Sequence, residues 1–158
     1  MMKLFNYIII LLFLFPGLLY GKTIIGKPKI IDGDTIHIRE NKIRLHGIDA
    51  PETKQTCKLG SQKWFCGKES TMKLKRKIND YEVKCLITDI DSYNRYVAIC
   101  SVNNININEW MVKNGWAIAY RYYSKDYVNE ERHARTNKLG IWKSKFLEPY
   151  QFRKQNKN

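Results

Sequence analysis

IDGDTIHIRENKIRLHGIDAPE, residues 31–52, predicts a hairpin of two short strands bounded by acidic turns. Residues 35–39 alternate isoleucines with polar side chains, which is the pattern of a half-buried strand. We expect a turn at residues 40–42 and a second strand over residues 43–48. The alternation in the second strand places Ile43, Leu45 and Gly47 on one face and Arg44, His46 and Ile48 on the other.

The ends of this hairpin gather acidic side chains. Asp34 precedes the first strand and Asp49 follows the second, so an antiparallel hairpin brings both to the same end. Two neighbouring carboxylates repel each other unless a cation joins them. Their oxygens are hard ligands, which favours Ca²⁺ or Mg²⁺ over zinc or copper. The histidines do not cluster in the sequence, which argues against a histidine-bound metal; they are His37, His46 and His133.

Three motifs, in this order, resemble the staphylococcal nuclease family. They are DGDT at residues 32–35, RLHGIDAPE at residues 44–52 and DSYNR at residues 91–95. The resemblance extends from about residue 24 to residue 142. Periodicity alone predicts a β-rich α+β protein, whereas the resemblance implies a five-stranded OB-type β-barrel with about three helices.

The resemblance implies a Ca²⁺ site at the acidic end of the hairpin. Asp34 and Asp49 match the metal carboxylates of the family, and the backbone carbonyl of Ala50 takes the position of a third protein ligand. The family often has Thr at the Ala50 position, but a carbonyl ligand does not depend on the side chain. Asp32 matches a family carboxylate that lies near the metal and reaches it through water.

The resemblance also implies the catalytic groups. Glu52 matches the general base that removes a proton from the attacking water. Arg44 and Arg95 match two arginines, whose planar guanidinium groups can each meet two phosphoryl oxygens as negative charge develops. Asn94 replaces the glycine that the family usually has before Arg95, so we expect a slightly altered loop.

Two tyrosines are expected near the nucleotide. The sequence AYRYY at residues 119–123 places Tyr120 where the family has the first of them. The second is Tyr122 or Tyr123, and we favour Tyr123 as the substrate-binding residue. Packing in the core or on the surface explains these rings equally well.

The chain divides into three segments. Residues 1–21 combine a charged start, a short apolar core and a small residue, which is typical of a secretory signal peptide. Residues 22–143 form the expected nuclease-like domain, and residues 144–158 a basic tail that docks only near residues 149–152. Export to the periplasm or the medium follows from this reading. The alternative is a membrane anchor at residues 4–20, although 13 apolar residues are few for a bilayer span.

Charge and cysteine content support an exported protein that meets polyanions. The net charge is +13 for the chain, or +12 without the one lysine of residues 1–21, which favours nucleic acid or anionic membrane as a partner. The four cysteines suggest two disulfides in an oxidising compartment, and no CxxC spacing suggests zinc. Three pairings are possible, of which we favour Cys57–Cys66 and Cys85–Cys100.

The remaining elements follow from periodicity and from helix signals. Asn106 and Glu109 form a capping-box pattern that begins a helix ended by Gly115, and Asp126 could cap a later one. Residues 53–66 are predicted to be a polar loop. The expected strands cover residues 23–31, 81–88 and 95–102, with an extended piece at 117–120, and the other helices cover 67–78 and 127–138.

These observations predict an exported, Ca²⁺-dependent nuclease that hydrolyses DNA and RNA. By resemblance the 5′-oxygen leaves and the products end in 3′-phosphate. No stable protein partner is implied, and a monomer is expected. One alternative is an OB-like module that binds nucleic acid without cleaving it, and another is a basic structural protein of the cell envelope. The acidic set at residues 34–52 favours the nuclease over both.

Overall fold

The computed structural model describes residues 21–156. The predicted signal peptide and the alternative anchor at residues 4–20 therefore lie outside the described residues, apart from Gly21. Within the described part, no helix has the length and apolar character needed to cross a bilayer.

The central hairpin is formed by β3 (Thr35–Ile38) and β4 (Asn41–Leu45). Its turn is tighter than predicted, because Ile38 pairs with Asn41 and only two residues connect the strands. Arg39 belongs to this turn and not to the strand, and it adopts a positive φ of 53°. The short turn sets the register in which Thr35 pairs with Arg44, at the acidic end of the hairpin.

The second predicted strand is interrupted after Leu45. Gly47 adopts a φ of +70°, and the chain resumes as β5 (Ile48–Asp49), which pairs with β11 (Ile118–Ala119). Strict alternation predicted that Ile48 lies on the same face of the strand as Arg44. This prediction is wrong, because Ile48 is fully buried. The glycine changes the phase of the strand, so the core receives Ile48.

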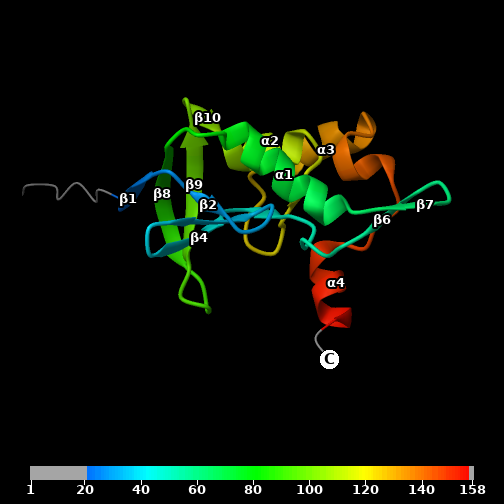
Figure 1. Cartoon of the computed structure of the whole chain (residues 1–158), viewed down its shortest axis with the longest axis horizontal. Coiled ribbons are helices and arrows are strands. Elements are labelled where there is room, and N and C mark those ends of the chain that lie inside the picture. The colour runs from blue at the N-terminus through cyan, green and yellow to red at the C-terminus, as the bar shows by residue number, and fades with distance from the viewer. Residues whose placement is uncertain (1–20, 157–158) are drawn as a thin grey trace, which may run out of the picture.

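The sheet curls because its two edges are joined by a very short link. The strand order is β1-β8-β9-β4-β3-β2, and β10 pairs with β9. Only Lys27 and Pro28 separate β1 at one edge from β2 at the other, so the predicted single strand is two. Figure 1 shows the resulting curled sheet. The strands not yet bounded are β1 (Thr23–Gly26), β2 (Lys29–Ile30), β8 (Val83–Ile90), β9 (Tyr96–Val102) and β10 (Ile105–Asn106).

Helices cover the sheet on one side, and α4 stands apart from them (Figure 1). The capping prediction for α2 is confirmed, since the side chain of Asn106 accepts a hydrogen bond from the Glu109 amide. The cap proposed for α3 is wrong, because Asp126 contacts His46 and makes no cap bond. The helices are α1 (Cys66–Ile78), α2 (Ile107–Lys113), α3 (Val128–Thr136), the 3₁₀ turn η1 (Gly140–Lys143) and α4 (Pro149–Gln155).

Residues 53–66 are not simply a loop. They contain a small hairpin of β6 (Cys57–Leu59) and β7 (Gln62–Trp64), which leads directly into α1. The disulfide Cys57–Cys66 closes this hairpin against the start of the helix. The polar sequence of the hairpin conceals the strands, because only Cys57 and Trp64 at its base pack inward and the residues between them are exposed.

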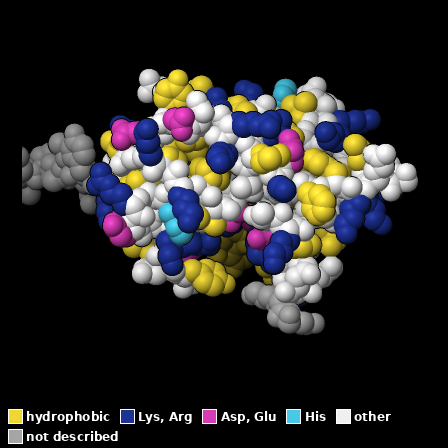
Figure 2. Space-filling model, in the orientation of Figure 1, with side chains coloured by type: hydrophobic (Ala, Val, Ile, Leu, Met, Phe, Trp, Pro, Cys, Tyr) yellow, Lys and Arg dark blue, Asp and Glu magenta, His cyan; other side chains and the backbone are white. Residues whose placement is uncertain are grey.

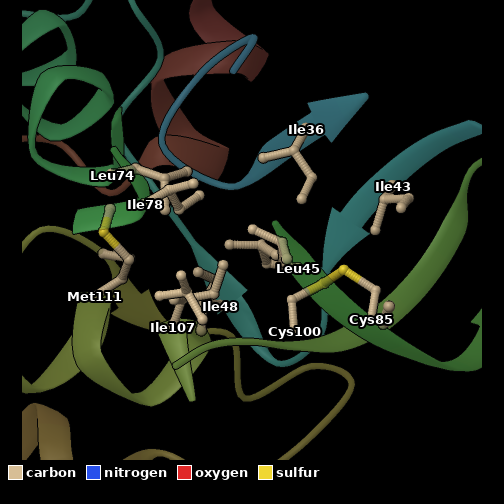
Figure 3. Packing of buried hydrophobic residues seen from close by; sticks show 14 of the residues in the cluster. Ile36, Ile43, Leu45, Ile48, Leu74, Ile78, Cys85, Cys100, Ile107 and Met111 are labelled. Atoms are coloured by element: carbon tan, nitrogen blue, oxygen red, sulfur yellow. A yellow bond between two sulfur atoms is a disulfide. The ribbon is translucent and has the colours of Figure 1, made fainter. Parts of the chain in front are cut away.

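The core fills the space between the curled sheet, α1 and α2, and its aliphatic side chains interdigitate there (Figure 3). The second disulfide lies in this core, where Cys85 and Cys100 face each other across β8 and β9. Both favoured disulfide pairings are thus confirmed. The fold class is also confirmed, as a mixed α+β chain with a curled OB-type sheet.

Candidate functional site

The turn before β3 is fixed by its own polar groups and by close packing. The amide of Asp34 donates to Asp32 Oδ1 at 2.9 Å, and two preceding amides donate to the carbonyl of Thr35. Gly33 packs so tightly that a Cβ there would lie 2.3 Å from Ser70 Oγ and 2.6 Å from Ala50 Cβ. The glycine of DGDT therefore allows the acidic turn to contact α1 and the segment after β5.

Arg44 joins the two carboxylates at the end of the hairpin. Its Nη1 donates to Asp34 Oδ1 and its Nη2 to Asp49 Oδ1, each at 3.0 Å. Asp34 also accepts, through Oδ2, the amide of Ala50 at 2.9 Å. Both carboxylates are buried, so one guanidinium holds two charges that water does not reach. The hairpin thus brings together Asp34, Arg44, Asp49 and Ala50, as the sequence predicted.

A residue that sequence reasoning missed completes this cluster. Arg153 of α4 donates through Nη1 to Asp49 Oδ1 and to Glu52 Oε1, both at 2.9 Å, and through Nη2 to Asp49 Oδ2 at 3.1 Å. Asp49 therefore accepts hydrogen bonds from two arginines while its own side chain is fully buried. Only the basic character of residues 144–158 pointed toward this segment.

The charges of the cluster shift the affinity of its groups for protons. Burial raises the pKa of Asp49, and the hydrogen bonds from Arg153 and the charge of Arg44 oppose that rise. Burial and the nearby charge of Asp34 raise the pKa of Asp32 to about 7. Burial alone would lower the pKa of Arg44, but the two adjacent carboxylates raise it above its ordinary value. The carboxyl groups of the site outnumber its guanidinium groups. The carboxyl groups belong to Asp32, Asp34, Asp49 and Glu52, and the guanidinium groups to Arg44 and Arg153.

The position of Glu52 is set by its backbone. Its amide donates to Gln55 Oε1 at 3.2 Å, and its carbonyl accepts the Gln55 amide at 2.7 Å. Gly67, in the first turn of α1, packs so closely that a Cβ there would lie 1.7 Å from the Glu52 carbonyl oxygen. The Glu52 side chain is one third exposed and accepts only the Arg153 bond, through Oε1. Its Oε2 is thus available for a proton.

Arg95 is not joined to this cluster by any contact in the described structure. Its guanidinium is held by Asp91, with Nε donating to Oδ2 at 2.7 Å. Arg95 immediately precedes β9, the strand in which Val97 pairs with Arg44. Asn94 adopts a φ of 58°, so asparagine supplies the left-handed turn that the family usually builds with glycine.

The tyrosines predicted near the nucleotide form a cluster of three rings. Tyr120 lies beside Arg44, whose guanidinium carbon is 5.8 Å from the ring centroid. Tyr123 contacts the Tyr120 ring at a centroid distance of 5.2 Å, against 6.3 Å for Tyr122. Tyr122 and Tyr123 are largely exposed, so these rings are not core residues, and their surfaces remain available.

The carboxylates of the site are ligands of the type that a hard divalent cation binds, and an ion would share them with protein donors. All four oxygens of Asp34 and Asp49 accept hydrogen bonds, which come from Thr35, Arg44, Arg153 and the Ala50 amide. Two buried carboxylates converge on one guanidinium, and Ala50 lies against one of them. Within residues 21–156, no group of three or more His, Cys, Asp or Glu side chains is arranged to hold a metal alone. An ion here would therefore depend on two carboxylates, a backbone carbonyl and water, which Ca²⁺ accepts.

The surroundings of the site are basic and hollowed. A cavity of about 470 Å³ adjoins Glu52 and Arg153 and extends over the start of the following loop and the end of α4. Figure 2 shows lysine and arginine side chains spread over the viewed face, with few acidic side chains between them. Such a surface attracts polyanions and concentrates them near the cluster. The cavity is lined by Glu52, Thr53, Lys54, Phe152, Arg153 and Asn156.

The site combines buried carboxylates joined by arginines with a basic surface. In comparison with known proteins, residues 42–144 match the family model described as staphylococcal nuclease homologue. The chain belongs to the staphylococcal nuclease family. Membership places it among the nucleases, whose substrates are nucleic acids.

Three relatives illustrate the range of this similarity. The chain is 31% identical to the micrococcal nuclease of Shigella flexneri over 82% of its own length and 80% of that protein. It is 32% identical to the succinoglycan biosynthesis protein ExoI of Rhizobium meliloti, covering 78% of this chain and 67% of that protein. It is 36% identical to the probable staphylococcal-like nuclease CAN2 of Oryza sativa, covering 79% of this chain but only 32% of the rice protein.

Proposed function

We propose that the protein hydrolyses phosphodiester bonds of DNA and RNA in a Ca²⁺-dependent reaction at the cluster around Arg44. The observation that carries this proposal is the pair of 3.0 Å contacts by which Arg44 joins Asp34 and Asp49, beside Glu52. The family match supports the nuclease class. Asp34, Asp49 and the Ala50 carbonyl would hold the ion, which when bound supplies positive charge that neutralises the phosphate.

Glu52 is the general base of this proposal. Its free Oε2 takes a proton from the water that attacks phosphorus, while Arg153 holds Oε1. The exposed third of the side chain gives water access to that oxygen. In the described structure the Glu52 side chain contacts only Arg153, so no other role for this loop residue is evident.

Arg44 and Arg95 are the proposed phosphate ligands. Negative charge on the phosphoryl oxygens grows as the water attacks, and a guanidinium that gains contact with them lowers the barrier. Arg95 must leave or share its bond with Asp91 to do this. Its place just before β9, the strand that pairs with β4, supports the assignment. Departure of the 5′-oxygen leaves a 3′-phosphate, as the family resemblance implies.

Tyr120 and Tyr123 are proposed to bind the nucleotide. Their clustered rings border Arg44, and an exposed aromatic face can stack on any base. Tyr123 is favoured over Tyr122 because its ring lies closer to Tyr120. A monomer without a stable protein partner is the proposed working form.

We also propose that the protein acts outside the cytoplasm, in the periplasm or the medium. Both disulfides support this, because such bonds persist in oxidising compartments. The charged and apolar pattern of residues 1–21 supports export through a signal peptide.

Cleavage of single-stranded DNA and RNA by the purified chain, with Ca²⁺ and with excess chelator, tests the proposal. Glu52→Gln should lower turnover by roughly 10²- to 10⁴-fold, because it removes the proton acceptor. Glu40→Gln is the matched control, since Glu40 lies exposed in the hairpin turn, away from the cluster, and should leave turnover unchanged.

Two results would contradict the proposal in different ways. Near-normal turnover of Glu52→Gln would remove Glu52 as the base while leaving the nuclease assignment intact. Absence of cleavage with every divalent ion, together with tight and salt-sensitive binding, would indicate the nucleic-acid-binding module instead.

A further inference from the structure

Arg153 is the one guanidinium in the described structure that contacts both Asp49 and Glu52. It reaches them from α4, 104 and 101 residues further along the chain. The match to the family model ends at residue 144, so α4 lies beyond the part that defines the family. The contact therefore lies outside the segment that matches the family model.

The contact extends a line of alternating charges through the site. Asp34, Arg44, Asp49, Arg153 and Glu52 follow one another, and each neighbouring pair is within 3.0 Å. Asp49 stands at the centre of this line and is fully buried. Through Arg153, which lies on a distant segment, the Glu52 carboxylate is thus tied to Asp49, the proposed metal ligand three residues earlier in the chain.

The residues before α4 are firmly attached beside the Glu52 loop. Gln55 donates through Nε2 to the carbonyl of Leu147 at 2.7 Å, and the same side chain accepts the Glu52 amide. Gln55 is fully buried, so it links both segments away from water. Lys58 and Lys145 exchange two backbone hydrogen bonds of 2.8 Å, one residue from the Cys57–Cys66 disulfide. These attachments hold α4 in a fixed position relative to Glu52.

The geometry holds Glu52 without covering it. Arg153 occupies Oε1 and leaves Oε2 without a hydrogen bond, and the Glu52 side chain remains 34% exposed. A side chain that blocked Glu52 would be expected to occupy both of its oxygens or to bury its carboxylate. Arg153 contacts both oxygens of the buried Asp49, but only one oxygen of Glu52. The rigid attachment of the segment before α4 also differs from that of a movable strap.

We propose that Arg153 is a positioning residue of the nuclease site, which holds the Glu52 carboxylate at a fixed place against Asp49. This inference rests on the proposed function, in which Glu52 is the general base. A free glutamate side chain samples several rotamers, and only a fraction of them directs an oxygen at the attacking water. The bridge from Asp49 selects one arrangement before substrate binds.

Steady-state cleavage by Arg153→Gln, Arg153→Lys and Lys154→Gln tests this role. Arg153→Gln should lower kcat by about tenfold to a hundredfold with KM changed by less than about threefold, because orientation of the base is lost but substrate binding is not. Arg153→Lys should recover part of the loss, since it keeps the charge but not the bidentate contact. Lys154→Gln removes an exposed charge from the same helix and should behave as the wild type.

Chemical rescue separates positioning from a purely structural effect. Arg153→Ala leaves space for a guanidinium ion, which at millimolar concentration should restore part of kcat. A double-mutant cycle of Arg153→Ala and Glu52→Gln tests whether the contact exists in solution. If it does, the effect of the double variant on the unfolding equilibrium constant should differ by about tenfold from the product of the two single effects.

The outcomes distinguish this inference from the proposed function. An active wild type whose kcat is unchanged or increased in Arg153→Gln overturns the positioning role and leaves the nuclease assignment standing. Loss of kcat without guanidinium rescue and without coupling to Glu52 also overturns it, by reducing Arg153 to a structural residue. An inactive wild type refutes the proposed function, and the positioning role with it.

Discussion

Replacement of Gly67 by alanine should displace Glu52 without touching any charged group. The new Cβ would lie 1.7 Å from the Glu52 carbonyl oxygen, and separations below 3.0 Å essentially never occur, so the two segments must part by about 1.3 Å (3.0 minus 1.7). A misplacement of about 1 Å at a reacting group can lower a rate by roughly 10²-fold. We therefore expect kcat for DNA cleavage to fall by about a hundredfold.

The effect on stability should not exceed the effect on rate, since a hundredfold loss of rate corresponds to about 2.7 kcal/mol. Forcing an extra methyl group into packed structure costs about 1–3 kcal/mol, and alanine recovers about 1 kcal/mol of helix propensity relative to glycine. Kinetics and urea unfolding measured on the same preparation give both quantities. Gly60→Ala is the control for the rate, because no atom lies within 4 Å of the Cβ that it adds in the β6–β7 turn. Its φ of +62° strains alanine, so this control should itself lose about 1–2 kcal/mol of stability while its rate stays unchanged. A folded Gly67→Ala protein with a rate within about threefold of wild type would refute this account of the Glu52 position.

Two further predictions concern the framework around the site. Asn108→Ala should lower the free energy of unfolding by about 1–3 kcal/mol. The reason is that the buried Cys100 amide loses its acceptor, and the His46 and Ala98 carbonyls lose a donor. Urea unfolding measures this loss, and a change below about 0.5 kcal/mol would contradict the prediction. Burial alone would raise the pKa of Asp91, but the hydrogen bonds from Arg95 hold this pKa below the ordinary value of 3.8. The ionised Asp91 should therefore contribute its full stabilisation above about pH 4. That stabilisation should be lost as the pH falls further through the lowered pKa. Unfolding curves from pH 6 to pH 2 should thus differ in slope between wild type and Asp91→Asn, and parallel curves would show that the ion pair has no effect.

The parts of the fold that the sequence predicted are those with strong local signals. Alternating isoleucines defined the hairpin, and Asn106 with Glu109 marked the start of α2. An even cysteine count in a chain with an export pattern indicated both disulfides. Motif spacing also brought Asp34, Arg44 and Asp49 to one place, because all three belong to a single hairpin and its bounding turns.

The parts that escaped prediction depend on contacts between distant segments. The hairpin β6–β7 packs inward only through Cys57 and Trp64 at its base, so periodicity could not detect it. Ile48 was assigned to the wrong face because the φ of Gly47 shifts the alternation, and a glycine inside a strand pattern was the available warning. Arg153 gave no local signal, since its partners lie about a hundred residues away.

The order of the charged residues along the chain has a consequence for biosynthesis. A ribosome completes Asp34, Arg44, Asp49 and Glu52 early, and it adds Arg153 about a hundred residues later. During that interval a nascent chain has its acidic groups with only Arg44 to neutralise them. Because Arg153 is the last of these groups to be added, the proposed arrangement of the base forms only after α4 has been synthesised and has docked.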